Sequence, residues 1–221
     1  MEDAPRQTEK ARSRDPERTK GQIMQGALQE FAASGYHGAK IEDIARAASC
    51  NARLIYHYYG NKEQLYLAAL ERIYSQIRKE ERALNLDTLA PKHAVQALVE
   101  FTFDFFDTNP VFGKITRNEN LLGGRYISKT SAIREMSRPL LTKIGVVLER
   151  GYVEGVFTQR ADPLHLYVTI VALSAHHLNS AHTLSATFGQ DLTDPAWRAE
   201  RRKHAVSFVL HALGATESRI G

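Results

Sequence analysis

Residues 41–59 constrain the fold of this chain more than any other stretch, because they form a pattern of two short helices joined by a tight turn. In the first half, Ile41, Ile44 and Ala48 recur at the three- and four-residue spacing of one helical face. A second short helical run, residues 52–58, follows almost at once. Two helices joined in this way form the helix-turn-helix unit, whose second helix enters the major groove of DNA. At ~1.5 Å per residue, a helix of about seven residues is roughly 10 Å long, close to the ~12 Å width of that groove.

Helical corners of this kind also occur in all-α enzymes, so periodicity alone leaves DNA binding and a purely structural corner both open. Individual side chains around the corner favour the first. In chain order they are Phe31, Gly35, Tyr36, Gly38, Ile44, Ala45, Ala48, Ile55, Tyr56, His57, Tyr58, Tyr59, Lys62, Glu63 and Leu65. In order and spacing, over about residues 17–77, they resemble the TetR (tetracycline-repressor) family of one-component transcriptional regulators. The resemblance implies an N-terminal three-helix DNA-binding domain and a C-terminal helical domain that dimerises and binds a small molecule.

Four places depart from the usual family pattern. Lys40 stands where the second helix usually opens with Thr, and Ser49-Cys50 stands where the turn usually has Gly-Val. Arg53 replaces a Gly early in the third helix, and Tyr59 replaces a final Phe. These differences leave the expected fold unchanged. They lie in and around the second helix of the motif, which would contact the bases, so no operator sequence is carried over from a relative. From Asn109 on, the chain is also similar to the pyrimidine-utilisation repressor group of the same family, and no ligand is carried over from that likeness.

Composition is that of an ordinary globular protein of 221 residues, with 43% hydrophobic and 24% charged residues. The formal charge is +4 and the isoelectric point about 9.2, which tolerates a polyanionic partner without requiring one. Residues 1–60 contain nine Lys or Arg against eight Asp or Glu. The DNA-binding hypothesis therefore rests on motif and geometry and not on bulk charge.

Cysteine content and the lack of long apolar segments indicate the cellular compartment. Cys50 is the only cysteine, so no intrachain disulfide can form, as expected of a protein in a reducing cytoplasm. A small residue filling the turn explains Cys50 better than a redox sensor does. The sequence has no run of 18 apolar residues, and residues 1–20 lack the apolar core of a secretory signal. We expect a cytoplasmic protein with no membrane partner.

The sequence predicts three segments. Residues 1–15 are polar and aperiodic and are interpreted as a disordered arm. Its basic residues could contact DNA or could be solvated without contacting it. Acidic residues in the same segment dilute the positive charge, which favours the solvated arm. Residues 16–60 are the predicted helix-turn-helix domain, and residues 61–221 the predicted regulatory and dimerisation domain.

Helical periodicity and Gly or Pro breaks predict an all-α fold of about nine helices. The predicted helices are 16–34, 41–48, 52–58, 62–84, one between a break at 86–91 and Asn109, 110–122, 129–154, 163–187 and 195–213. Pro139 is expected to kink or interrupt the seventh. In the fourth, a charged set is assigned to the solvent face: Glu71, Arg72, Arg78, Lys79, Glu80, Glu81 and Arg82. The last two helices are apolar on more than one side. This predicts that residues 163–187 and 195–213 together form a homodimer interface, or alternatively that both helices are simply part of the core.

The predicted DNA-binding residues lie in and around the second helix of the motif. Asn51, Arg53, Leu54 and His57 can face the groove, where Arg can pair with guanine and Asn with adenine. Tyr58 and Lys62 are better placed for phosphates, which position a protein without specifying sequence. The full set is Lys40, Asn51, Ala52, Arg53, Leu54, Tyr56, His57, Tyr58 and Lys62. The predicted partner is a palindromic double-stranded operator.

A one-component regulator needs an effector to bias it between two states. Polar residues stranded among apolar ones in the C-terminal part are candidate lining residues, although a satisfied interface group is the commoner explanation for each. They are Arg117, Asn118, Asn120, Arg125, Tyr126, Tyr167, His176, His177 and Asn179. His176, His177 and His182 lack the three- or four-residue spacing that places two metal ligands on one helical face, so no metal site is predicted.

No sequence motif for catalysis or for a cofactor occurs. The chain has no phosphate-cradling glycine loop, no GxSxG elbow and no dinucleotide fingerprint. We therefore predict a DNA-binding transcriptional regulator that is not an enzyme, with repression released by an unknown small molecule. The alternative from another class is an all-α enzyme or ligand carrier whose helical corner is structural.

Overall fold

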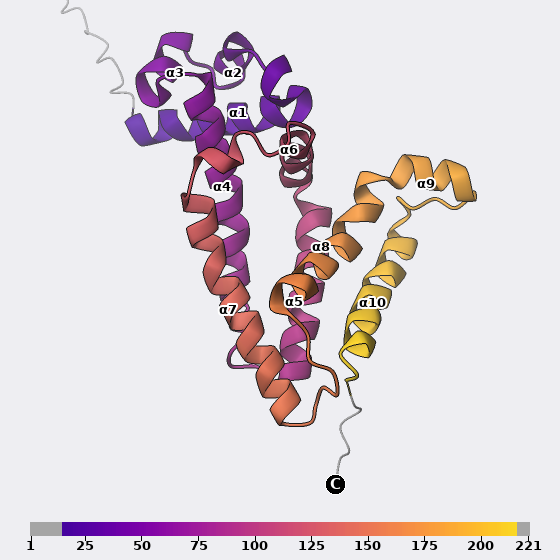
Figure 1. Ribbon diagram of the computed structural model, residues 1–221. Coiled ribbons are helices and arrows are strands. Elements are labelled where there is room, and N and C mark those ends of the chain that lie inside the picture. Colours follow the sequence, from indigo (N-terminus) through magenta and orange to yellow (C-terminus); the bar gives the residue numbers. More distant parts are fainter. Residues whose placement is uncertain (1–14, 216–221) are drawn as a thin grey trace, which may run out of the picture. The chain divides into compact units, whose positions relative to one another are not determined.

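The computed structural model describes residues 15–215 and divides the chain into two compact units, Met1–Tyr66 and Leu67–Gly221. The predicted disordered arm lies outside the described residues except for Asp15. The described residues are helical throughout their regular structure, and the all-α prediction is confirmed (Figure 1).

The first unit contains α1 (Pro16–Gly38), α2 (Ile41–Ala47) and α3 (Ala52–Tyr59), followed by the first residues of α4 (Lys62–Ala83). The side chain of Asp15 caps α1 by accepting a hydrogen bond from the amide of Glu17 at 3.0 Å. Gly35 interrupts the regular helix with φ 65° and ψ −178°, a backbone conformation that only glycine adopts readily. The predicted end of the first helix at Gly35 is therefore a kink, after which one more turn continues to Gly38.

Gly26 allows α1 and α2 to cross closely. A Cβ atom at this position would lie 3.1 Å from the carbonyl oxygen of Ile44 and 3.3 Å from the Cβ of Ala47. At Gly21, in the same helix, a Cβ would meet nothing within 4 Å. The contact at Gly26 is to backbone, which cannot rotate away as a flexible side chain can. The absence of a side chain at Gly26 thus sets how closely α2 packs on α1.

Gly26→Val is expected to lower the free energy of unfolding by about 1–3 kcal/mol, because the added side chain must push α2 away from α1. Gly21→Val is the matched control and should change it by less than about 0.5 kcal/mol, as surface substitutions usually do. Urea unfolding followed by circular dichroism measures both. Equal losses in the two variants would show that the crossing at Gly26 has no special role.

The second unit consists of the rest of α4 and six further α-helices. They are α5 (Pro91–Thr108), α6 (Pro110–Leu121), α7 (Ala132–Val153), α8 (Pro163–Asn179), α9 (Ala181–Phe188) and α10 (Pro195–Ala212), with a short 3₁₀ turn η1 (Ile127–Lys129) before α7. Within this unit α5 is central and packs against α6, α7, α8 and α10 (Figure 1). No helix between residues 15 and 215 is long and apolar enough to cross a lipid bilayer.

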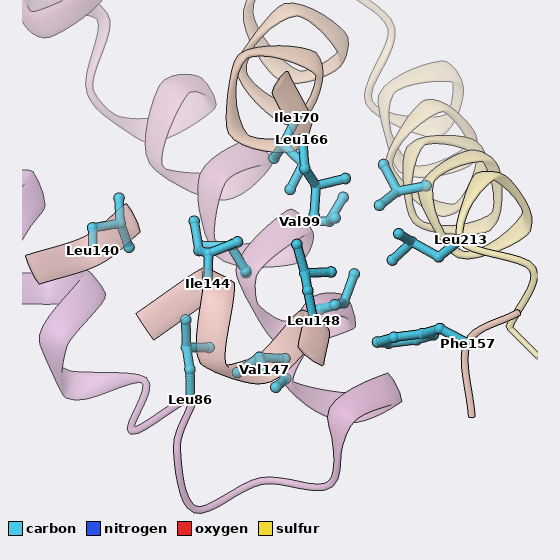
Figure 2. Close-up of a cluster of buried hydrophobic side chains, with 14 of the residues drawn as sticks. Leu86, Val99, Leu140, Ile144, Val147, Leu148, Phe157, Leu166, Ile170 and Leu213 are labelled. Atoms are coloured by element: carbon cyan, nitrogen blue, oxygen red, sulfur yellow. The ribbon is translucent and has the colours of Figure 1, made fainter. Parts of the chain in front are cut away.

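The core of the second unit lies where α5, α7, α8 and α10 meet. Figure 2 shows its side chains converging, among them Leu86, Val99, Leu140, Ile144, Val147, Leu148, Phe157, Leu166, Ile170 and Leu213. Val99 and Ile170 are fully buried and Phe157 is 1% exposed. Burying side chains of this size contributes about 1.5–3 kcal/mol each, so this cluster supplies much of the stability of the unit.

The structure has ten α-helices between residues 15 and 215, where the sequence predicted about nine in the whole chain. The predicted helix 163–187 is two helices, because Ser180 leaves helical geometry with φ −117° and ψ 11°. Ser and Asn compete with the helix for backbone hydrogen bonds, and Asn179-Ser180 is such a pair. Pro139 does not break α7, which continues through it and begins three residues later than predicted, after the 3₁₀ turn.

Candidate nucleic-acid interface and effector cavity

Helix α3 is short, anchored on one side and exposed on the other. Its N-terminus is capped by Asn51, whose Oδ1 accepts a hydrogen bond from the amide of Arg53 at 2.8 Å. Its C-terminus ends at Gly60, which has φ 78°. Ile55 is fully buried, and α3 packs against α2. The opposite side is left available to a partner.

The exposed side of α3 carries most of the predicted reading residues. Arg53, Tyr56 and His57 are exposed, and the Tyr56 side chain is 50% exposed. Asn51 is also exposed, but its side chain is held at the N-terminus of α3 by the capping hydrogen bond. Outside the helix, Lys40 is exposed. Ala52, Leu54 and Tyr58 are half-buried.

Lys62 sits at the start of α4, as expected, with its ammonium group held against α1. Its Nζ lies 4.9 Å from the centre of the Tyr36 ring and donates a weak hydrogen bond to the carbonyl oxygen of His37 at 3.4 Å. Partial burial lowers the pKa of Lys62, and Glu30 acts in the opposite direction. An ammonium group has three donors, so this contact leaves capacity for a phosphate oxygen.

Lys20 is a basic residue near α3 that the sequence analysis did not single out. Its ammonium group lies 5.7 Å from the centre of the Tyr58 ring and 3.0 Å from a carboxylate oxygen of Glu17. The hydroxyl of Tyr59 donates to the carbonyl oxygen of Lys20 at 3.4 Å, and burial raises the pKa of Tyr59. These contacts join α1 to the C-terminal end of α3. Local periodicity cannot reveal them, because the partners are 39 residues apart.

The second unit contains a cavity of about 280 Å³ between α4, α5, α6 and α8. Its walls are largely aromatic and aliphatic, and the rings of Tyr74 and Phe106 both pack edge-on against Phe112, with centroids 5.4 and 5.5 Å away. Four of the predicted lining residues lie on it: Arg117, Asn120, Tyr167 and Asn179. Mostly apolar walls with a few convergent polar groups are typical of small-molecule sites.

The other predicted lining residues lie elsewhere. Tyr126 is buried, and its amide donates to Oε1 of Glu119 at 2.7 Å, while Arg125 lies over its ring. His177 is buried and stacks on Phe103, with ring centroids 5.0 Å apart; burial lowers its pKa to about 4. His176 is exposed and Asn118 half-buried, and neither is among the residues that line the cavity.

Arg78 and Glu81 are buried, so their predicted place on the solvent face of the fourth helix is wrong. They are 6% and 3% exposed and form an ion pair of 2.9 Å. The hydroxyl of Tyr167, from α8, accepts from Nη2 of Arg78 at 2.8 Å and donates to Oε1 of Glu81 at 2.9 Å. The opposite charges three residues apart satisfy one another, so this charged segment can be buried, and Arg78 lines the cavity beside Tyr167.

Two family descriptions match the chain. Residues 23–69 match "Bacterial regulatory proteins, tetR family", and residues 91–209 match "Tetracyclin repressor-like, C-terminal domain". The first match covers α2, α3 and most of α1, and the second runs from α5 almost to the end of α10.

Known proteins give the same result. The chain is 33% identical to the HTH-type transcriptional repressor NicS of Pseudomonas putida over 86% of its own length and 89% of that protein. It is 27% identical to the HTH-type transcriptional regulator RutR of Escherichia coli K12, over 91% of its own length and 93% of RutR. A tetR-family regulatory protein of Rhodococcus RHA1 has the same fold, with a TM-score of 0.69 and 18% identity. The match covers 90% of this chain and 98% of the Rhodococcus protein. These relatives are regulators, which decides against the enzyme alternative. The chain belongs to the TetR family and is a DNA-binding transcriptional regulator.

Proposed function

We propose that this regulator is a repressor that binds a two-fold symmetric operator as a homodimer and leaves it when a small molecule fills the cavity of the second unit. The observation that carries the proposal is α3, a capped helix with Ile55 buried and with Arg53, Tyr56 and His57 exposed. NicS, which is 33% identical to the chain over 189 aligned residues, is named a repressor, and this supports repression as the sign of regulation.

In this proposal, Arg53, Tyr56 and His57 face base edges in the major groove, with Leu54 and Ala52 beside them. Arg53 is the strongest candidate for reading sequence, because a guanidinium can pair with both acceptors of guanine. Lys40, Tyr58 and Lys62 contact phosphates and fix the position of the helix. Asn51 contributes by capping α3, since its oxygen is bonded to the amide of Arg53.

The homodimer is proposed to form through α8 and α10, which pack on each other within the unit. Leu164 and Val168 of α8 are 53% and 58% exposed, and Phe208 of α10 is 49% exposed. Exposed large apolar side chains on neighbouring helices mark an interaction surface. A second copy of the same surface would cover them and place two α3 helices on one duplex.

The cavity is proposed as the effector site. Tyr74, Ile77 and Arg78 line it from α4, the helix whose first residues belong to the DNA-binding unit. A ligand that orders the cavity wall therefore contacts the same helix that continues from α3 through Gly60. Differential affinity for two positions of α4 is what an effector needs in order to change DNA binding.

Selection of bound sequences from random duplexes tests the DNA-binding part. The expected product is one site with two inverted half-sites about one helical turn apart, bound with an affinity whose logarithm falls linearly with the logarithm of salt concentration. Enrichment of a single asymmetric half-site would argue against the dimer. If no duplex is retained at low ionic strength, the proposed function is wrong and the ligand-carrier alternative is the better reading.

A further inference from the structure

Arg78, Glu81 and Tyr167 form a buried network in the wall of the cavity, in which Nε of Arg78 and Oε2 of Glu81 have no hydrogen-bond partner among the described residues. The hydroxyl of Tyr167 has one proton, and because it accepts from Arg78 it must give that proton to Glu81. Nη1 of Arg78 lies 2.9 Å from Oε2 of Glu81, and the two side chains are 7% and 2% exposed. The arrangement fits an ionised Glu81 whose charge is balanced mainly by Arg78, with a smaller effect of Arg82.

The guanidinium of Arg78 also has unused donor capacity. Its Nε is buried and finds no hydrogen-bond acceptor among the residues that the structure describes. Arg78 lines the cavity of about 280 Å³ and also a smaller one of about 40 Å³ beside Met136 and Leu140. This Nε is closed off from the cavity, so a ligand can use it only after displacing the contacts between Arg78 and Glu81. A carboxylate carried on a small apolar body suits a buried guanidinium next to aromatic walls.

We propose that the effector is a compact organic acid whose carboxylate replaces Glu81 as the ion-pair partner of Arg78, and that Glu81 takes up one proton from solvent as the acid binds. The inference rests on the proposed role of the cavity as the effector site. A volume of about 280 Å³ lies at the lower end for pockets of drug-sized ligands, so the acid is small.

The direction of proton movement follows from the surroundings of Glu81. Burial raises its pKa to about 7, against the opposing effects of Arg78, Tyr167 and Arg82. Of the other charged groups near it, Arg82 is exposed, and Lys143 of α7, which lines the smaller cavity, is paired with Asp87 at 3.0 Å. Neither replaces Arg78 once a ligand carboxylate has engaged it. The pKa of Glu81 therefore rises further on binding, and the carboxyl group becomes protonated.

This linkage sets the pH dependence of affinity. Below about pH 6, Glu81 is already protonated in the free protein, so binding takes up no proton and affinity is constant. Above about pH 7, each binding event must add a proton, and affinity falls by up to about tenfold per pH unit. A carboxylic acid ligand is itself ionised over this whole range and does not contribute to the slope.

Titration calorimetry with benzoate and hexanoate, each paired with its uncharged amide, tests the inference. At about pH 6 both carboxylates should bind at least about tenfold more tightly than benzamide and hexanamide, the usual advantage of a charge-assisted hydrogen bond. At about pH 8, measurements in two buffers of different ionisation enthalpy should show an uptake approaching one proton per site. Amides that bind as tightly as the acids, or acids that bind without proton uptake, would overturn the proposal.

Variants of α4 assign the proton to Glu81. Glu81→Gln keeps the shape but does not titrate, so carboxylate affinity at pH 8 should rise to its pH 6 value and proton uptake should vanish. Glu80→Gln is the matched control: Glu80 is exposed on the same helix, and its replacement should leave both unchanged. In the Glu81→Gln background, Arg78→Met leaves no unpaired buried charge and should abolish the preference for carboxylates. Persistent proton uptake in Glu81→Gln would show that another group is responsible.

Operator release by the same probes separates this inference from the proposed function. If acids and amides release the operator equally, the cavity is the effector site and the inference about acids is wrong. If the acids bind with proton uptake but the operator stays bound, the inference about the site stands and the effector role of the cavity is wrong.

Discussion

Arg53→Ala is expected to weaken binding to the selected operator by about ten- to a hundredfold, while affinity for random duplex DNA changes by less than about threefold. Arg53 is exposed on α3. Loss of a bidentate contact to guanine costs about 1–3 kcal/mol and is felt only at the sequence that supplies the guanine. The helix itself should persist, because alanine retains the amide that Asn51 caps. Fluorescence anisotropy on both duplexes measures the ratio.

Arg46→Ala is the matched control for Arg53. Arg46 lies on α2 and is equally charged and exposed, but its guanidinium is paired with Asp43 at 2.7 Å. Its removal should change operator and random affinity to the same small extent. If Arg53→Ala behaves like Arg46→Ala, the residue contributes only charge, and the specificity must come from elsewhere on α3.

Gly151→Ala is expected to lower the free energy of unfolding by about 3 kcal/mol, the upper end for overpacking a core. A Cβ there would lie 2.3 Å from two ring atoms of Phe157 and 2.9 Å from the Cβ of Pro91. The Phe157 ring is 1% exposed, and its amide donates to the carbonyl oxygen of Gly151 at 2.9 Å, so the ring has little freedom to withdraw. In a chain of this size the loss corresponds to a fall in melting temperature of about 6–12 °C, measurable by calorimetry.

A second substitution should relieve this clash. Phe157→Leu removes the ring atoms that the new methyl group meets, so Gly151→Ala should cost less in a Phe157→Leu background, with a coupling of about 1 kcal/mol or more. Gly113→Ala is the control, because a Cβ there meets nothing within 4 Å. If Gly151→Ala is tolerated as well as Gly113→Ala, the close approach of α7 to Phe157 is not a constraint on the core.

The bounds of α2 and α3 were predicted from the sequence to within one residue because their signals are local. Asn51 caps α3 and Gly60 ends it. Ile41 and Ile44 mark the buried face of α2, and Ile55 marks that of α3. The N-caps Asp162 and Asp194 likewise fix the starts of α8 and α10, each followed by a proline. Such signals depend only on neighbours along the chain.

Features that depend on distant partners were not predictable from local pattern. Arg78 and Glu81 have the composition of a solvated face, and only the hydroxyl of Tyr167, 86 residues from Glu81, completes their burial. The cavity is defined by aromatic residues such as Tyr74 and Phe112, which periodicity assigns to an ordinary core. Which polar side chains reach the cavity depends on which helices meet, and local pattern does not contain that information, so several of the predicted lining residues lie elsewhere. The break at Ser180 was missed because it interrupts an otherwise apolar run.

The cap on α3 has a consequence for how such a regulator could acquire a new target. Because Asn51 holds the first turn of α3 through the Arg53 amide, exchanging it for a residue without a short side-chain oxygen would destabilise that turn by about 1 kcal/mol. Libraries built to retarget the protein should therefore keep Asn, Asp, Ser or Thr at this position and randomise Arg53, Tyr56 and His57. Diversification confined to those three exposed positions leaves the scaffold intact while every member of the library samples a different set of bases.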